Sequence, residues 1–151
     1  MKNRFMSLVV ILIFVFFLSA CSSDSPKPFT PEDSDKITLE VTNRTEDLNG
    51  VYYTIKLTNK SSHIIKQNIV FISYPFKTDS GSKGNVFKVE AKNNKLDIKP
   101  KEEVILNAIT PKKEFEDNKN ILVNECYLEI KGYIDQVKDE NHFEKTIGKQ
   151  F

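Results

Sequence analysis

The side chains best suited to catalysis or metal binding are few and widely spaced in this 151-residue sequence. His63 and His142 are the only histidines, and neither has a cysteine, histidine or aspartate partner at metal-ligand spacing. We therefore expect two solvated surface histidines and no metal or cofactor site. Cys126 could act as a nucleophile, but it alternates with Leu128 and Ile130, which predicts a buried, unreactive thiol.

Three further patterns match functional motifs only in part. Residues 80–84 lack the spacing of a phosphate-binding loop and no helix follows them, so we expect a flexible hairpin. The acids at 32, 33 and 35 and at 114, 116 and 117 lack the fixed ligand positions of a calcium loop, which favours solvated charge. Asn43 and Asn59 each begin an Asn-x-Ser/Thr triplet at a strand end, where such residues form turns. No pattern resembles a catalytic constellation, and we expect the protein not to be an enzyme.

The second cysteine, Cys21, lies where an apolar segment meets a polar one. Lys2 and Arg4 precede an uncharged apolar run, residues 5–20. This run is slightly short for a membrane span and is typical of an export signal. The residues directly before the cysteine are Leu18, Ser19 and Ala20.

Together, Leu18, Ser19, Ala20 and Cys21 resemble the lipobox of bacterial lipoproteins, in which Leu, a small residue and Ala or Gly precede Cys. The resemblance implies cleavage between Ala20 and Cys21, a diacylglyceryl group on the Cys21 sulfur and N-acylation of the new terminus, with palmitate among the acyl chains. The alternative is an uncleaved anchor helix with an incidental cysteine. Two acyl chains suffice for stable anchoring, because each buried CH₂ contributes about 0.8 kcal/mol.

Composition divides the chain into three parts. Residues 1–20 are the expected signal peptide, residues 21–35 the lipidated cysteine with a disordered linker, and residues 36–151 a single domain. The linker contains Pro26, Pro28 and Pro31 among serines and acids, a composition that predicts an extended tether. Phe29 is its only apolar residue, and we assign it no role.

From Lys36 onward the hydrophobic period is two, which predicts half-buried strands. One segment is apolar on both faces, as expected of a central strand that contains Val70 and Ile72. In the strand of Cys126 the side chains expected to face outward are Tyr127, Glu129, Lys131 and Tyr133. The seven expected strands are residues 37–41, 51–59, 68–74, 86–91, 103–109, 126–134 and 142–147.

Seven short antiparallel strands predict an all-β fold, an immunoglobulin-like β-sandwich, with a small barrel as the alternative. The order of IKLTNKSS, IVFISYPF and LDIKPKEEVIL resembles the single immunoglobulin-like domains of small lipoproteins from Bacillus and related Firmicutes, most of uncharacterised function. The resemblance covers most of residues 36–147, carries no active site and implies a Gram-positive source. The sequence departs from antibody-type domains, because it has no Trp and no cysteine to pair with Cys126.

The balance of basic and acidic residues argues against a nucleic-acid-binding protein. Lys and Arg total 22 against 21 Asp and Glu, so the basic excess of a nucleic-acid-binding protein is missing. We expect a non-enzymatic binding or protein-interaction module, monomeric and held on the outer face of the cytoplasmic membrane by the lipid on Cys21. Its expected partner is an envelope protein. The alternatives are an envelope enzyme or enzyme inhibitor with a loop-borne site, and a carrier of a small ligand or metal.

Overall fold

The structure, a computed structural model, describes residues 27–151. The expected signal peptide, the lipobox and residues 21–26 of the expected linker therefore lie outside the described residues. The described part consists mainly of antiparallel strands, which confirms the all-β prediction.

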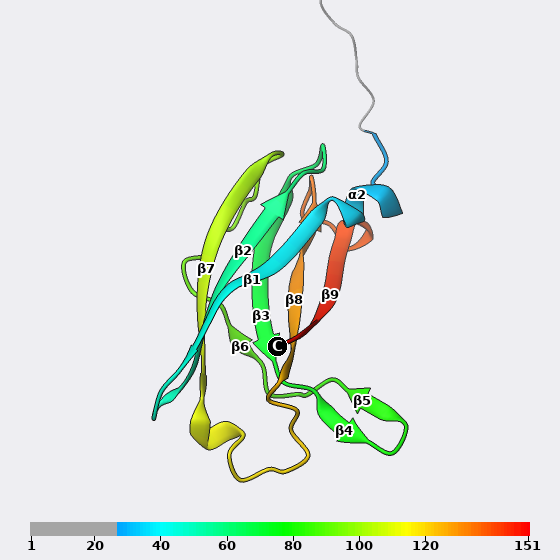
Figure 1. Ribbon diagram of the computed structural model, residues 1–151. Helices are drawn as coiled ribbons and strands as arrows, with labels where there is room; N and C mark the ends of the chain where they lie inside the picture. The colour runs from blue at the N-terminus through cyan, green and yellow to red at the C-terminus, as the bar shows by residue number, and fades with distance from the viewer. Residues whose placement is uncertain (1–26) are drawn as a thin grey trace, which may run out of the picture.

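Two antiparallel sheets form the domain (Figure 1). The first has the order β1-β2-β7, with β1 (Ile37–Glu46), β2 (Gly50–Asn59) and β7 (Glu102–Pro111). The second has the order β6-β3-β8-β9, with β6 (Val89–Glu90), β3 (Ile65–Ser73), β8 (Glu125–Ile134) and β9 (His142–Gln150). A separate hairpin pairs β4 (Phe76–Thr78) with β5 (Gly81–Lys83). The immunoglobulin-like assignment of this strand order remains a prediction.

The core lies between the two sheets and consists of the inward side chains that the two-residue period predicts. Ile55 and Leu57 of β2 are fully buried, as are Val70 and Ile72 of β3. Cys126 is also fully buried on β8, which confirms the prediction for its side chain. Because burial of these apolar side chains supplies the main favourable term in folding, their alternation also determines which face of each strand turns inward.

The strand count and one outward position differ from the sequence prediction. Nine strands occur in residues 27–151, because residues 76–83 form an additional hairpin, while β6 keeps only two residues of the predicted strand 86–91. Glu129 faces outward on β8 but is only 7% exposed. Lys88 and Lys131 both contact its carboxylate. Burial alone would raise the pKa of Glu129, but these two lysines outweigh burial and lower the pKa.

The expectation of an extended tether is wrong for the segment just before β1, where helix α2 (Pro31–Asp35) forms. Thr30 is its N-cap, and Pro31 occupies the first turn, where proline is tolerated. The Thr30 hydroxyl accepts a hydrogen bond from the Asp33 backbone N–H at 3.3 Å, and the Asp33 carboxylate accepts one from the Thr30 backbone N–H at 3.3 Å. This capping box satisfies backbone groups that a short helix would otherwise leave unpaired.

The domain has two distinct ends, and α2 lies at one of them together with the β2–β3, β6–β7 and β8–β9 connections (Figure 1). The opposite end carries the β1–β2 turn, the β4–β5 hairpin, the 3-10 turn η1 (Lys112–Glu114) and the C-terminus (Figure 1). A second 3-10 turn, η2 (Asp139–Asn141), lies in the β8–β9 connection. Within residues 27–151 no helix has the length and apolar character needed to cross a membrane.

Candidate functional site

His63 lies at the α2 end of the domain and is buried, with 3% exposure, so the expectation of a solvated histidine is wrong here. The β2–β3 turn that carries it is built around Asn59, which is also buried. The Asn59 amide donates to the carbonyls of His63 (2.8 Å) and Ile98 (3.1 Å), and its oxygen accepts from the Ser61 hydroxyl at 2.7 Å. These bonds confirm that the Asn59 triplet forms a turn, and they hold His63 inward.

Asp135, at the end of β8, orients the His63 ring. One carboxylate oxygen lies 2.6 Å from His63 Nδ1, and the other accepts a hydrogen bond from the Ile64 backbone N–H at 2.8 Å. The Asp135 backbone N–H donates to the Ile64 carbonyl at 2.8 Å. Asp135 has a positive φ of 60°, a conformation that aspartate tolerates better than most residues. Backbone and side-chain hydrogen bonds of Asp135 therefore join the β8–β9 connection to the β2–β3 turn.

The segment before β1 covers the other side of the imidazole. Asp33 Oδ2 lies 3.7 Å from His63 Nε2, and the Phe29 ring meets the imidazole edge-on at 5.5 Å. Phe29 also packs edge-on against the buried ring of Phe143, again at 5.5 Å. Lys36 donates to Asp33 Oδ1 at 3.1 Å, and this bond, together with that from the Thr30 hydroxyl, lowers the pKa of Asp33.

The resulting arrangement is an imidazole between two carboxylates, with the Phe29 ring against its edge. In the described part of the chain, His63 Nε2 is a buried nitrogen without a hydrogen-bond partner, and no hydroxyl or thiol hydrogen-bonds to the ring. A base oriented by Asp135 would need an accessible Nε2 beside a nucleophile or substrate to perform acid–base chemistry. Because Phe29 and Asp33 cover Nε2, the geometry supports a role in holding the segment before β1 against the domain.

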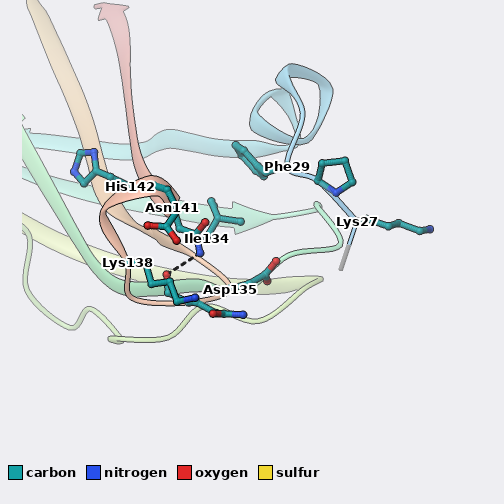
Figure 2. A pocket seen from close by; sticks show the side chains of 10 residues that line it. Lys27, Phe29, Ile134, Asp135, Lys138, Asn141 and His142 are labelled. Atoms are coloured by element: carbon teal, nitrogen blue, oxygen red, sulfur yellow. Dashed lines mark hydrogen bonds between the residues drawn. The ribbon is translucent and has the colours of Figure 1, made fainter. Parts of the chain in front are cut away.

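A cleft of about 480 Å³ runs beside this cluster. Figure 2 shows Lys27 and Phe29 on one side of it and the β8–β9 connection, with Asp135 and Lys138, on the other. His142 also lines the cleft and is exposed, as the sequence predicted. Its ring meets that of Tyr133 edge-on, with the ring centroids 5.8 Å apart.

Cys126 is fully buried in the hydrophobic core. Burial raises the pKa of its thiol to about 12, so the nucleophilic thiolate is scarce at neutral pH. Nearby, the Tyr53 and Tyr74 hydroxyls lie 2.7 Å apart, and Tyr74 lies 2.7 Å from the Thr110 hydroxyl. Burial raises the pKa of both tyrosines, which keeps these hydroxyls neutral and mutually hydrogen-bonded.

The remaining sequence patterns do not come together as a site. Residues 80–84 lie largely in the β4–β5 hairpin, as predicted, with Gly81 at a φ of 140° that favours glycine. Residues 112–114 form a single 3-10 turn beside the second acidic group. Across residues 27–151 no group of three or more His, Cys, Asp or Glu side chains could hold a metal ion.

Sequence reasoning missed Phe29, Asp33 and Asp135 as partners of His63. A local signal for α2 was present, because Thr30-Pro31-Glu32-Asp33 combines an N-cap threonine, an N1 proline and an acid at the third helical position. No comparable signal existed for Asp135, which lies 72 residues from His63.

No protein-family model and no curated protein matches this chain.

Proposed function

We propose that the protein is a lipid-anchored, non-enzymatic interaction module on the outer face of the cytoplasmic membrane of a Gram-positive bacterium. The proposal rests on the export signal, the lipobox at Leu18 to Cys21 and the all-β domain that follows. In this proposal the mature chain begins at an acylated Cys21, and its partner is another envelope protein.

The observation that carries the proposal furthest is the position of the N-terminal segment at one end of the domain (Figure 1). From Cys21 to Lys27 the chain can span at most about 20 Å. A lipid on Cys21 would therefore keep the α2 end near the bilayer and direct the β4–β5 end away from it. The connections at that far end carry two almost fully exposed apolar side chains, Leu48 (90%) and Val86 (97%). Single exposed apolar side chains are common on protein surfaces, and we place the proposed contact there because this end would face away from the bilayer.

Site-specific photocrosslinking in living cells tests where the partner binds. A photoreactive residue at Leu48 or Val86 should give the same crosslinked envelope protein. The matched control is Lys99, which is also exposed but lies in the β6–β7 connection at the α2 end. Equal crosslinking from Lys99, or none from either far-end position, would contradict the proposed surface.

Metabolic labelling with palmitate tests the anchor separately. Wild-type protein should incorporate the label, and Cys21→Ala should not, because the acceptor sulfur is gone. Cys126→Ala is the matched control, since it removes the other cysteine and should leave labelling unchanged. Labelling of Cys21→Ala at the wild-type level would refute the lipobox assignment.

A further inference from the structure

The contact between residues 29–36 and the rest of the domain is held by more than one side chain. Phe29 packs edge-on against His63 and Phe143. On the other side of α2, Lys145 of β9 donates hydrogen bonds to the carbonyls of Ser34 (2.7 Å) and Ile37 (2.9 Å). The segment is therefore clamped between the β2–β3 turn and strand β9.

At the centre of this contact, the two nitrogens of His63 have different surroundings. Nδ1 lies 2.6 Å from Asp135, slightly shorter than an ordinary N–H···O hydrogen bond and consistent with an N–H that donates to a charged carboxylate. Nε2 lies 3.7 Å from Asp33 Oδ2, too far for a hydrogen bond, and is buried. The second carboxylate belongs to α2, so the space between Nε2 and Asp33 is the junction between the helix and the domain.

The protonation state of the His63 imidazole determines whether a hydrogen bond can form between Nε2 and Asp33. A neutral ring that donates from Nδ1 to Asp135 presents an unprotonated Nε2 to Asp33, and the two acceptors cannot bond. A protonated ring presents an N–H at both positions, so a small approach of α2 would complete a charge-assisted hydrogen bond to Asp33. Protonation would thereby pair the buried Nε2 that is otherwise without a partner.

We propose that residues 29–36 form a latch on the domain, and that protonation of His63 between Asp135 and Asp33 tightens it. An open latch would release Phe29 from Phe143 and uncover Nε2 of His63. The latch itself does not depend on the lipid. If the proposed anchor is correct, the latch also determines how firmly the domain is oriented relative to the bilayer.

The charged groups around His63 are compatible with this device. From α2 and its C-cap the ring is approached by Asp33, whose partner is Lys36, and from the β8–β9 connection by Asp135. Lys145 of β9 bonds to α2 carbonyls and lies 4.0 Å from Asp35. Because the Lys36 and Thr30 hydrogen bonds hold the pKa of Asp33 below its usual range, Asp33 stays ionised at the pH values where histidines titrate.

Hydrogen exchange of the full-length chain in detergent tests the latch. The protection factors of amides 32–36, corrected for intrinsic exchange, should be on the order of tenfold higher near pH 5.5 than near pH 8, the size of one charge-assisted hydrogen bond. His63→Gln and Asp33→Asn should each abolish this dependence. The control is His142→Gln, which removes the exposed histidine of the adjacent cleft and should keep it.

Each outcome bears directly on the proposal. Equal protection of amides 32–36 at both pH values in the wild-type chain would overturn it, and that measurement needs no variant. A pH dependence that persists in His63→Gln would also overturn it, with circular dichroism confirming that the variant is folded. Neither result would affect the palmitate and crosslinking tests, so the latch and the proposed function can fail independently.

Discussion

Replacement of Phe29 by alanine distinguishes a docked N-terminal segment from a loose tether. The Phe29 side chain is half-buried against the core and forms two edge-on contacts, with His63 and Phe143. Truncation of a fully buried phenylalanine costs about 3–5 kcal/mol, so a half-buried ring should cost roughly half of that, about 2 kcal/mol. For a domain of this size, such a loss lowers Tm by roughly 8 °C.

The assay is thermal and urea unfolding of the chain from Lys27 to Phe151, followed by circular dichroism. Leu48→Ala is the control, because it removes a similar apolar volume from a side chain that is 90% exposed. The control should change the free energy of unfolding by less than about 0.5 kcal/mol. If Phe29→Ala is as mild as Leu48→Ala, residues 29–35 are not docked, and the role assigned to the His63 cluster is wrong.

Three further predictions concern the core, the thiol and acid stability. Ile72→Asp should abolish the cooperative unfolding of the domain, because it buries an unpaired carboxylate. Ile69→Asp on the same strand, at a position 37% exposed, should leave a folded protein. A folded Ile72→Asp variant would contradict the inward facing of this side chain on β3. The native chain from Lys27 to Phe151, in which Cys126 is the one cysteine, should resist Ellman's reagent at pH 8 and react with about one equivalent once denatured, because burial raises the pKa of Cys126 to about 12. Rapid reaction of this native chain would place the thiol at the surface. The pKa of Asp33 is lowered, so its contribution to docking is present above the ordinary carboxyl pKa and is lost as pH falls through the lowered value. The protection factors of amides 32–36, corrected for intrinsic exchange, should therefore fall in strong acid, and Asp33→Asn should remove that response.

Much of the core could be predicted from local alternation. The two-residue period placed Ile55, Leu57 and Cys126 inside before any partner strand was known, and all three are fully buried. A hairpin was expected at residues 80–84, but its two short strands, β4 and β5, were not among the expected strands, because residues 76–83 carry no apolar alternation. Helix α2 was not predicted, although Thr30 to Asp33 match a capping box. The proline-rich composition of the surrounding segment favoured an extended chain, and the capping signal spans only four residues.

The sequence by itself determined the all-β class, the facing of the core strands and the turn at Asn59, because each depends on residues close together in the chain. Only the tertiary structure decided the environment of His63. Its partners Asp33 and Asp135 lie on opposite sides of it in sequence, the latter 72 residues away, and no periodicity encodes which connections meet at one end of a sandwich. A histidine after two serines therefore appears solvated in the sequence, yet is buried because packing of Phe29 and α2 excludes water from it.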